Sequence, residues 1–248
     1  MRSIFTRVLL FVLSAASGSF VTSSAHSEDP YAARRAMLVA EIAAMARATG
    51  QETGHPVLSG PVMAAMGRVE RHRFVPADDV PYAYENRPLP IGHGQTISQP
   101  YIVALMTELA APEPSHVVLE VGTGSGYQAA VLAELVAQVY TIEIVAPVGE
   151  QGAANLKAAG YGNVKARIGD GYHGWPEAGP FDSILVTAAA PAVPPALLEQ
   201  LKPHGTLVIP VGGRWDVQEL LVIVKNDDGS TTTKATIPVR FVPLTRSK

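Results

Sequence analysis

Cysteine is absent from this chain of 248 residues. Without thiols there is no disulfide framework, no thiolate metal site and no cysteine nucleophile. Clustered positive charge is missing too, because 22 acidic residues outnumber the 19 lysines and arginines and no basic run stands out. A mildly acidic chain of this kind is a poor candidate for binding nucleic acid.

No apolar run long enough to cross a membrane stands out either. Residues 8–13 form an apolar run far shorter than the ~20 residues of a spanning helix, so we expect no stable membrane association. None of the seven histidines stands in a close pair such as H-x-x-x-H, so no metal site is expected. We interpret His72 and His93 as local hydrogen-bonding groups.

Residues 1–25 differ from the rest and follow the pattern of a secretory signal. Arg2 and Arg7 flank a short charged start, the apolar run follows, and small polar residues lead to Ser23-Ser24-Ala25. The pattern predicts cleavage near Ala25 and an exported protein, periplasmic or secreted. Cleavage would change the formal net charge from −3 to −5, because two arginines and no acids leave. A disordered or mis-annotated extension is the alternative interpretation.

The remaining sequence is predicted to fold as an α/β protein. Apolar residues make up 47% of the chain, enough for one substantial core. Residues 26–60 are expected to hold a surface helix, 31–48, and a loop, and residues 61–248 to form the main domain. Helices are expected at 62–69 and 101–110, and an extended or turn conformation at 76–90.

Beyond residue 112, short apolar runs alternate with helical stretches, which indicates a parallel sheet covered by helices. Strands are expected at residues 117–121, 139–144, 164–168, 181–187 and 206–211. Residues 219–224 and 234–241 flank the turn Asn226-Asp227-Asp228-Gly229-Ser230, which predicts a C-terminal antiparallel hairpin.

A glycine-rich turn is the most informative stretch. In Glu120-Val121-Gly122-Thr123-Gly124-Ser125-Gly126 a buried strand runs into three glycines and then a helix. Glycines allow left-handed backbone angles and close approach to a ligand, and the N–H groups of the next helix face that ligand. The spacing excludes the G-x-G-x-x-G fingerprint, the phosphate-binding P-loop and the hydrolase nucleophile elbow.

The remaining pattern, acid-x-Gly-x-Gly-x-Gly from Glu120, resembles the first motif of class I S-adenosylmethionine methyltransferases. This resemblance implies a Rossmann-like, doubly wound, mostly parallel sheet and S-adenosylmethionine as the methyl donor. Glu143, followed by Ile144, ends the next strand about 20 residues past the first glycine, as expected for a carboxylate that binds ribose hydroxyls. Asp170, before Gly171, ends another strand and is assigned to the adenine amino group. Alone, Glu143 would be an ordinary solvated strand end, and Gly169-Asp170-Gly171 an ordinary turn.

Upstream of that loop, the segment Leu89-Pro90-Ile91-Gly92-His93-Gly94-Gln95-Thr96-Ile97-Ser98-Gln99-Pro100-Tyr101 resembles the signature of protein-L-isoaspartate O-methyltransferases. The resemblance includes Arg71-His72-Arg73-Phe74-Val75-Pro76 and Val239-Arg240-Phe241-Val242-Pro243-Leu244, and it covers nearly everything after about residue 60. It implies an enzyme that methylates the carboxylate of L-isoaspartyl residues in damaged proteins, which initiates their repair. A monomer is expected, and the resemblance alone would imply a cytoplasmic location.

The same resemblance implies the site residues. Ser98 is the family's active-site serine, and we interpret its hydroxyl as the donor that orients the isoaspartyl carboxylate, with capping of the following helix as an alternative or additional role. Residues 187–189 and 211–212 are expected to meet the substrate backbone. The predicted cofactor-binding residues are Thr96, Ile97, Glu120, Gly122, Thr123, Gly124, Ser125, Gly126, Glu143, Ile144, Asp170 and Gly171.

Two other functions stay open at this point. A class I methyltransferase for a different acceptor would keep the glycine loop and Glu143 but would have no need of residues 94–100. An exported, non-catalytic binding protein is the second, because the source of S-adenosylmethionine outside the cytoplasm is not evident. Cofactor binding by the purified protein is the simplest discriminator.

Overall fold

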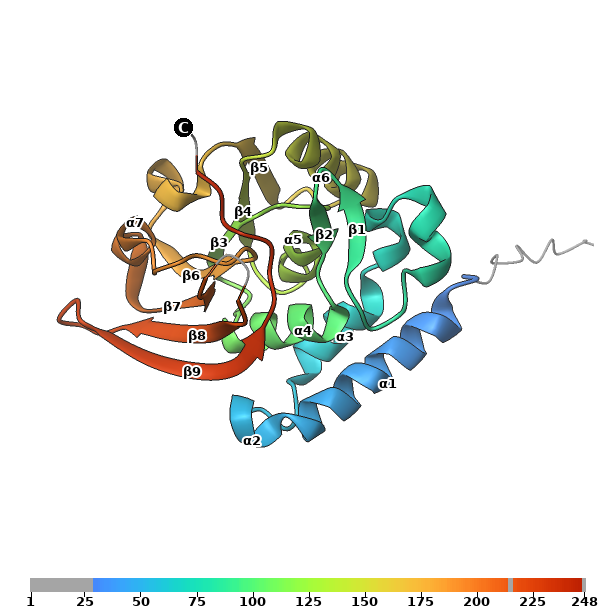
Figure 1. Cartoon of the computed structure of the whole chain (residues 1–248), viewed down its shortest axis with the longest axis horizontal. Helices are drawn as coiled ribbons and strands as arrows, with labels where there is room; N and C mark the ends of the chain where they lie inside the picture. Colours follow the sequence, from blue (N-terminus) through green and yellow to red (C-terminus); the bar gives the residue numbers. More distant parts are fainter. Residues whose placement is uncertain (1–28, 214–215, 247–248) are drawn as a thin grey trace, which may run out of the picture. The chain divides into compact units, whose positions relative to one another are not determined.

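A seven-stranded sheet forms the centre of the protein (Figure 1). The computed structural model describes residues 29–213 and 216–246, and the predicted signal, residues 1–25, lies outside them. Residues 31 onward belong to one compact unit. The strand order is β5-β4-β3-β6-β7-β8-β9. The bounds are β3 Val117–Val121, β4 Gln138–Glu143, β5 Val164–Ile168, β6 Phe181–Val186, β7 Leu201–Val211, β8 Gln218–Lys225 and β9 Thr231–Val239.

The five strands β5, β4, β3, β6 and β7 are parallel to one another. From β3 the chain first adds β4 and β5 on one side and later β6 and β7 on the other. Ligands of open α/β sheets bind outside the carboxyl ends of the strands where the order reverses in this way. The topology therefore places a candidate site beyond β3, beside β4 and β6.

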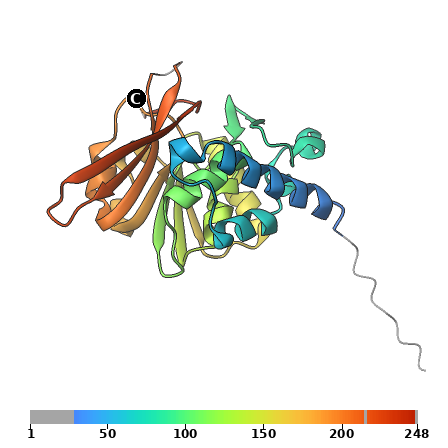
Figure 2. The same ribbon diagram turned by 90° about the horizontal axis from the view of Figure 1, so that it is seen from below.

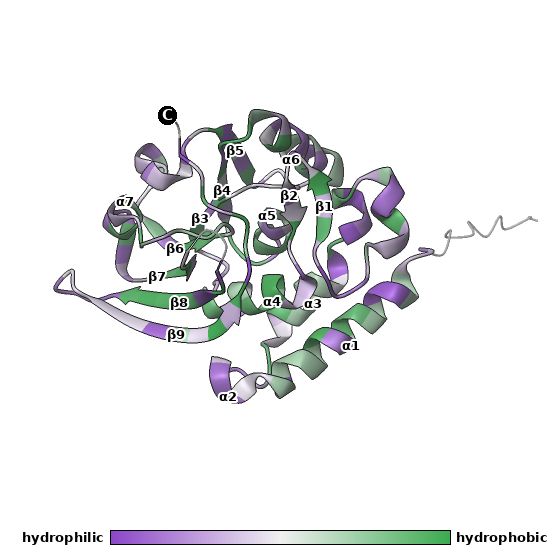
Figure 3. Cartoon of the chain, viewed as in Figure 1, coloured by the Kyte–Doolittle hydropathy of each residue, from purple (hydrophilic) through white to green (hydrophobic). Residues whose placement is uncertain are grey.

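The predicted C-terminal hairpin is confirmed. β8 pairs antiparallel with both β7 and β9, and the Asn226 N–H donates to the Ser230 carbonyl oxygen at 2.8 Å across the turn. Figure 3 shows β8 as hydrophobic along most of its length and β9 as much more polar. This polarity fits an edge strand, since β9 is exposed from Thr231 to Ala235. The mostly parallel, doubly wound sheet with an antiparallel end matches the predicted fold class.

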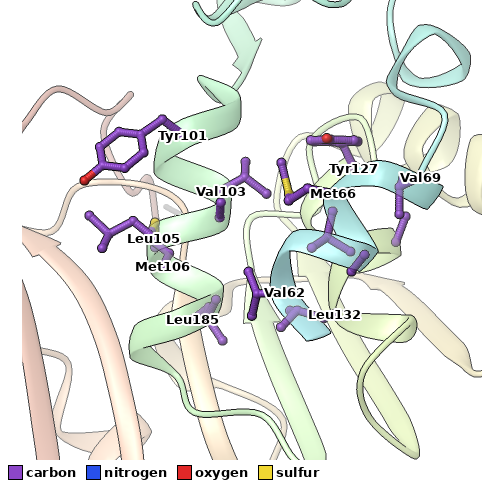
Figure 4. Close-up of a cluster of buried hydrophobic side chains, with 14 of the residues drawn as sticks. Val62, Met66, Val69, Tyr101, Val103, Leu105, Met106, Tyr127, Leu132 and Leu185 are labelled. Carbon is purple, nitrogen blue, oxygen red and sulfur yellow. The ribbon is translucent and has the colours of Figure 1, made fainter. Parts of the chain in front are cut away.

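Helices cover the sheet. They are α1 Ala32–Ala48, α2 Gly50–Thr53, α3 Gly60–Arg68, α4 Pro100–Leu109, α5 Tyr127–Ala133, α6 Ala146–Ala159 and α7 Pro195–Glu199. α1 packs on α3 and α4 (Figure 2), so the N-terminal helix belongs to the same unit as the sheet. Buried side chains from α3, α4 and α5 meet Leu185 of β6 in one cluster (Figure 4). In this part of the chain no helix is long and apolar enough to cross a membrane.

Upstream of the sheet the structure departs from the prediction. Residues 77–82, where an extended conformation was one expectation, form the 3₁₀ helix η2 Ala77–Tyr82, and a short helix, α2, stands in the predicted loop. Asp78 and Asp79 lie in the first turn of η2, where negative charge favours a helix. The signature segment folds into a hairpin of β1 Leu89–Gly92 and β2 Gln95–Ile97, for which no prediction was made.

Candidate active site

A cavity lies where the topology places it, at the carboxyl ends of β3 and β4. Three segments far apart in sequence enclose it: the glycine loop, the end of β2 with Ser98, and the chain after β9, which is dark red in Figure 1. That last segment is held beside the loop after β6, because the Ala189 N–H donates to the Val242 carbonyl at 2.8 Å and the Leu244 N–H donates to the Ala189 carbonyl at 2.7 Å.

The glycine loop has a backbone that requires glycine. Gly122, Gly124 and Gly126 have φ angles of +104°, +53° and +91°. A Cβ atom on Gly122 would also stand 2.4 Å from the Thr187 hydroxyl oxygen. The loop thus lies close against β6 and leaves its inner side open to the cavity.

Glu143 is held in place by backbone groups at the cavity wall. Its side chain is buried, and its two oxygens accept from the N–H groups of Gly124 and Val145, each at 3.0 Å. A carboxylate has about four lone-pair sites, so each oxygen can accept a further hydrogen bond. This arrangement suits a ligand that presents two neighbouring hydroxyl groups.

Glu120 lies deeper and is completely buried. One oxygen accepts from the Thr141 hydroxyl at 2.5 Å, while the other has no hydrogen-bond partner in the described part of the chain. The pKa of Glu120 is raised to about 8, chiefly by burial; the Thr141 hydrogen bond opposes this rise, and the charge of Glu143 contributes to it. A buried oxygen without a partner on a cavity wall is a place for a donor or a cation from a ligand.

Ser98 lines the cavity mouth and is half-buried. The helix that follows has Gln99, not Ser98, at its N-cap position and no side-chain cap, so the capping role is not observed. Within residues 29–213 and 216–246, no hydrogen bond engages the Ser98 hydroxyl. The hydroxyl is therefore available to a ligand.

Helix α1 supports the segment that carries Ser98. The sulfur of Met45 accepts hydrogen bonds from Asn86 Nδ2 at 3.0 Å and Gln99 Nε2 at 3.6 Å. Asn86 in turn accepts from the Tyr101 N–H at 3.0 Å, and the Tyr101 hydroxyl contacts the Thr49 hydroxyl. These contacts fix Gln99 and Tyr101, which follow Ser98 closely in the chain.

A second groove adjoins the cavity. Thr96, Ser98, Thr187 and Val242 line both, so the two spaces meet around the Ser98 hydroxyl. The groove continues between Ile102 and the chain around β9 and is mostly apolar. The geometry is that of a two-ligand site, with one pocket beneath the glycine loop and another on the outer side of Ser98.

Most of the predicted site residues line the cavity: Thr96, Ile97, Ser98, Glu120, Gly122, Thr123, Gly124, Ser125, Glu143, Ile144 and Gly171. Gly126 and Asp170 do not. Gly126 stands at the N-cap of α5, and Asp170 accepts from the Tyr172 N–H at 2.9 Å. Of the residues expected at the substrate backbone, Thr187 and Ala188 line the cavity, whereas Ala189, Val211 and Gly212 lie outside it.

Residues 242–245 also line the cavity, which the sequence did not predict. The sequence signal for part of this segment was the run from Val239 to Leu244. This run resembles the family, but the resemblance did not place it at the site. His72 bonds to the Tyr84 hydroxyl at 2.8 Å and stacks on Tyr31, and His93 lies at the exposed tip of the β1–β2 hairpin. Among the residues that the structure describes, no three acidic or histidine side chains gather to hold a metal ion.

Comparison with known proteins gives a consistent match. A model of the protein-L-isoaspartate(D-aspartate) O-methyltransferase family matches residues 50–248. Protein-L-isoaspartate O-methyltransferase 2 of Polaromonas sp. (strain JS666 / ATCC BAA-500) is 62% identical over 208 residues, which cover 84% of this chain and 99% of the relative. Protein-L-isoaspartate O-methyltransferase 2 of Syntrophobacter fumaroxidans is 55% identical, with 96% of this chain and 95% of the relative covered.

Solved structures match as well. A protein-L-isoaspartate O-methyltransferase superposes with a TM-score of 0.73 at 27% identity, over 84% of this chain and 65% of that one. A Plasmodium falciparum protein described as a β-aspartate methyltransferase, in complex with S-adenosyl-L-homocysteine, has a TM-score of 0.72 at 24% identity, over 85% of this chain and 98% of that one. At that identity the second likeness supports the fold.

Proposed function

The chain belongs to the protein-L-isoaspartate(D-aspartate) O-methyltransferase family, and we propose that the cavity, the groove and Ser98 are the parts that carry out this family's reaction. The protein is an S-adenosylmethionine-dependent protein-L-isoaspartate O-methyltransferase that acts on isoaspartyl proteins. The observation that carries the site assignment is the unengaged Ser98 hydroxyl on the wall shared by the two spaces.

The cavity under the glycine loop fits S-adenosylmethionine, which supplies a methyl group carried on a sulfonium cation. Glu143 would accept hydrogen bonds from the ribose hydroxyls through the lone pairs left free by Gly124 and Val145. Glu120 would receive a donor or positive charge at its unpartnered oxygen. The wall is completed by Thr96, Ile97, Gly122, Thr123, Gly124, Ser125, Ile144 and Gly171. Because Asp170 caps η3 (Gly171–His173) and lies outside the lining, its assignment to adenine has no support from the cavity.

On the other side, Ser98 would donate a hydrogen bond to one oxygen of the acceptor carboxylate and so aim the second oxygen toward the cavity. A carboxylate is already ionised at neutral pH, so the site needs no general base. Orientation of two reactants can contribute roughly 7–11 kcal/mol in favourable cases. Enclosure by β2 and the segment after β9 would remove water from the carboxylate and make it more nucleophilic.

The test is transfer of a labelled methyl group from S-adenosylmethionine to matched peptides that contain isoaspartate or aspartate at one position. We expect label on the isoaspartyl peptide alone. Ser230→Ala, in the β8–β9 turn, is the matched control for the substitution Ser98→Ala and should methylate the peptides as the wild type does. Equal labelling of both peptides, or none despite cofactor binding, would contradict the function.

Neither alternative function gains support. A methyltransferase for another acceptor would not need the β1–β2 hairpin, yet Thr96 and Ile97 of this hairpin line the cavity. A non-catalytic binding protein would not need an open groove that meets the cofactor cavity at a free hydroxyl.

We also propose that residues 1–25 export the chain and are removed after Ala25, and that the mature protein is a monomer. The support for export is the charged, apolar and small-residue pattern of the segment. Mass spectrometry of protein from the cell envelope should find a chain that starts at His26, and light scattering should give the mass of one chain. An intact Met1 terminus in the cytoplasmic fraction would contradict export.

A further inference from the structure

The outer groove carries a charge that the methylation reaction does not use. Among its described lining residues the only charged one is Arg240, directly after β9. Apolar side chains surround it in the lining, including Pro238, Phe241 and Val217, and Val217 is 52% exposed. An apolar groove with a single cation at its rim suits a polypeptide segment that brings an anionic side chain.

Arg240 is also uncommitted. Its side chain is exposed, and no hydrogen bond or ion pair engages it in the described part of the chain. Several other arginines are engaged, since Arg68 and Arg87 pair with Glu134 and Glu85, and Arg246 lies over the ring of Tyr172. The nearest acid by strand register is Glu219, opposite Pro238, and it forms no ion pair with Arg240.

We propose that Arg240 forms a subsite for an acidic side chain of the polypeptide substrate, close in sequence to the isoaspartyl residue. The inference rests on the proposed function, because it places the isoaspartyl carboxylate at Ser98, in the same groove. An extended peptide advances about 3.3–3.6 Å per residue, so neighbours of the isoaspartyl residue run along the groove. A guanidinium binds a carboxylate through two parallel hydrogen bonds, which gives direction as well as charge.

The experiment measures kcat/KM for isoaspartyl peptides that carry Glu, Gln or Lys at each of the two positions on either side. At one or more of these positions, wild-type protein should prefer Glu over Gln by about two- to fivefold, as for an exposed ion pair, and the gain should lie in KM. Arg240→Lys should keep part of this preference, Arg240→Ala should lose it, and Arg240→Glu should prefer Lys. High salt should weaken the preference.

Lys157→Glu is the matched control, because Lys157 is exposed on α6 and lies outside both the cavity and the groove. It changes the net charge as Arg240→Glu does and should leave the Glu-to-Gln ratio unchanged. Equal ratios for all three peptides in the wild type, or the same change of ratio in both charge-reversal variants, would overturn the subsite. Failure of the wild type to methylate any isoaspartyl peptide would instead overturn the proposed function.

Discussion

Glu120 and Glu143 are two carboxylates on one wall that experience different surroundings. Glu143 accepts two backbone hydrogen bonds, whereas Glu120 has one hydroxyl partner and no exposed surface. Burial raises the pKa of Glu120 to about 8. Glu143 is therefore an acceptor anchored by the backbone at the cavity wall, and Glu120 is a fully buried carboxyl that is protonated at neutral pH when no ligand is bound.

The raised pKa of Glu120 predicts how stability depends on pH. Its ordinary value is 4.5, so between pH 4.5 and about 8 the folded protein holds a proton that the unfolded chain has lost. Folding stability from this group therefore falls as pH rises through that window, by at most about 1.4 kcal/mol per pH unit. Glu120→Gln lacks this titration, so urea unfolding at pH 5 and pH 8 should show the variant gaining on the wild type at pH 8. A pH-independent difference would contradict the protonated state.

An alanine at Gly122 would suffer both backbone strain, from the positive φ angle, and a steric clash with Thr187. Gly160 serves as the control, because its φ angle is also positive, +89°, but nothing lies within 4 Å of an added Cβ. Gly160→Ala should lose about 1 kcal/mol of stability from the backbone angle alone. Gly122→Ala should lose more, about 2–4 kcal/mol in thermal or urea unfolding, since the new Cβ would meet Thr187. Equal losses of stability in the two variants would mean that Thr187, directly after β6, moves easily to make room for the new Cβ.

Helix α6 is placed by its glycines. A Cβ on Gly152 would stand 2.5 Å from the Gly124 carbonyl oxygen, so this helix packs directly against the glycine loop. Gly149, one turn earlier, approaches the Glu143 side chain in the same way. The position of α6 therefore determines where the glycine loop lies relative to the cavity.

Gly152→Ala should push α6 away from the loop. We expect a loss of about 1–3 kcal/mol in stability, as for other overpacked sites, and weaker binding of S-adenosylhomocysteine in calorimetry. Gly162→Ala, with open space around an added Cβ, is the matched control and should change neither quantity by much. Unaltered affinity in Gly152→Ala would show that the loop does not depend on α6.

At the scale of elements, the sequence predicts what local patterns encode. Strands β3 and β5 were predicted at their observed bounds, because β3 is a largely buried apolar run and each of the two strands is followed directly by glycine. The helix expected after the glycine loop is α5, which ends at Ala133. The 3₁₀ helix at residues 77–82 was missed because Pro76 and Pro81 favour an extended backbone locally. In the structure, Pro76 stands at the N-cap of this helix and Pro81 lies inside it.

At the scale of the molecule, the glycine loop and Glu143 were predictable because their spacing along two adjacent strands is fixed by the sheet. Residues 242–245 were not, because they reach the cavity only after the β8–β9 hairpin returns the chain to the loop after β6. The position of Arg240 could not be predicted for the same reason. Its role depends on where the chain leaves β9, which no local pattern reveals.

Ligand binding should stabilise the whole fold, since the cavity is built from segments on both sides of the sheet's switch point. S-adenosylhomocysteine at about 100 times its Kd should add about 2.7 kcal/mol, which corresponds to a rise in Tm of roughly 5–10 °C. Glu143→Ala should abolish most of this rise in a thermal scan. A full rise in that variant would remove Glu143 from the cofactor site.

The central claim is that the Ser98 hydroxyl orients the acceptor carboxylate at the meeting point of cavity and groove. The most direct test is the single-turnover rate of methyl transfer to an isoaspartyl peptide, at saturating S-adenosylmethionine, for the wild type and Ser98→Ala. Loss of one hydrogen bond to a charged group predicts a rate about 10- to 100-fold lower, with unchanged affinity for S-adenosylhomocysteine. An unchanged rate in Ser98→Ala would contradict the account.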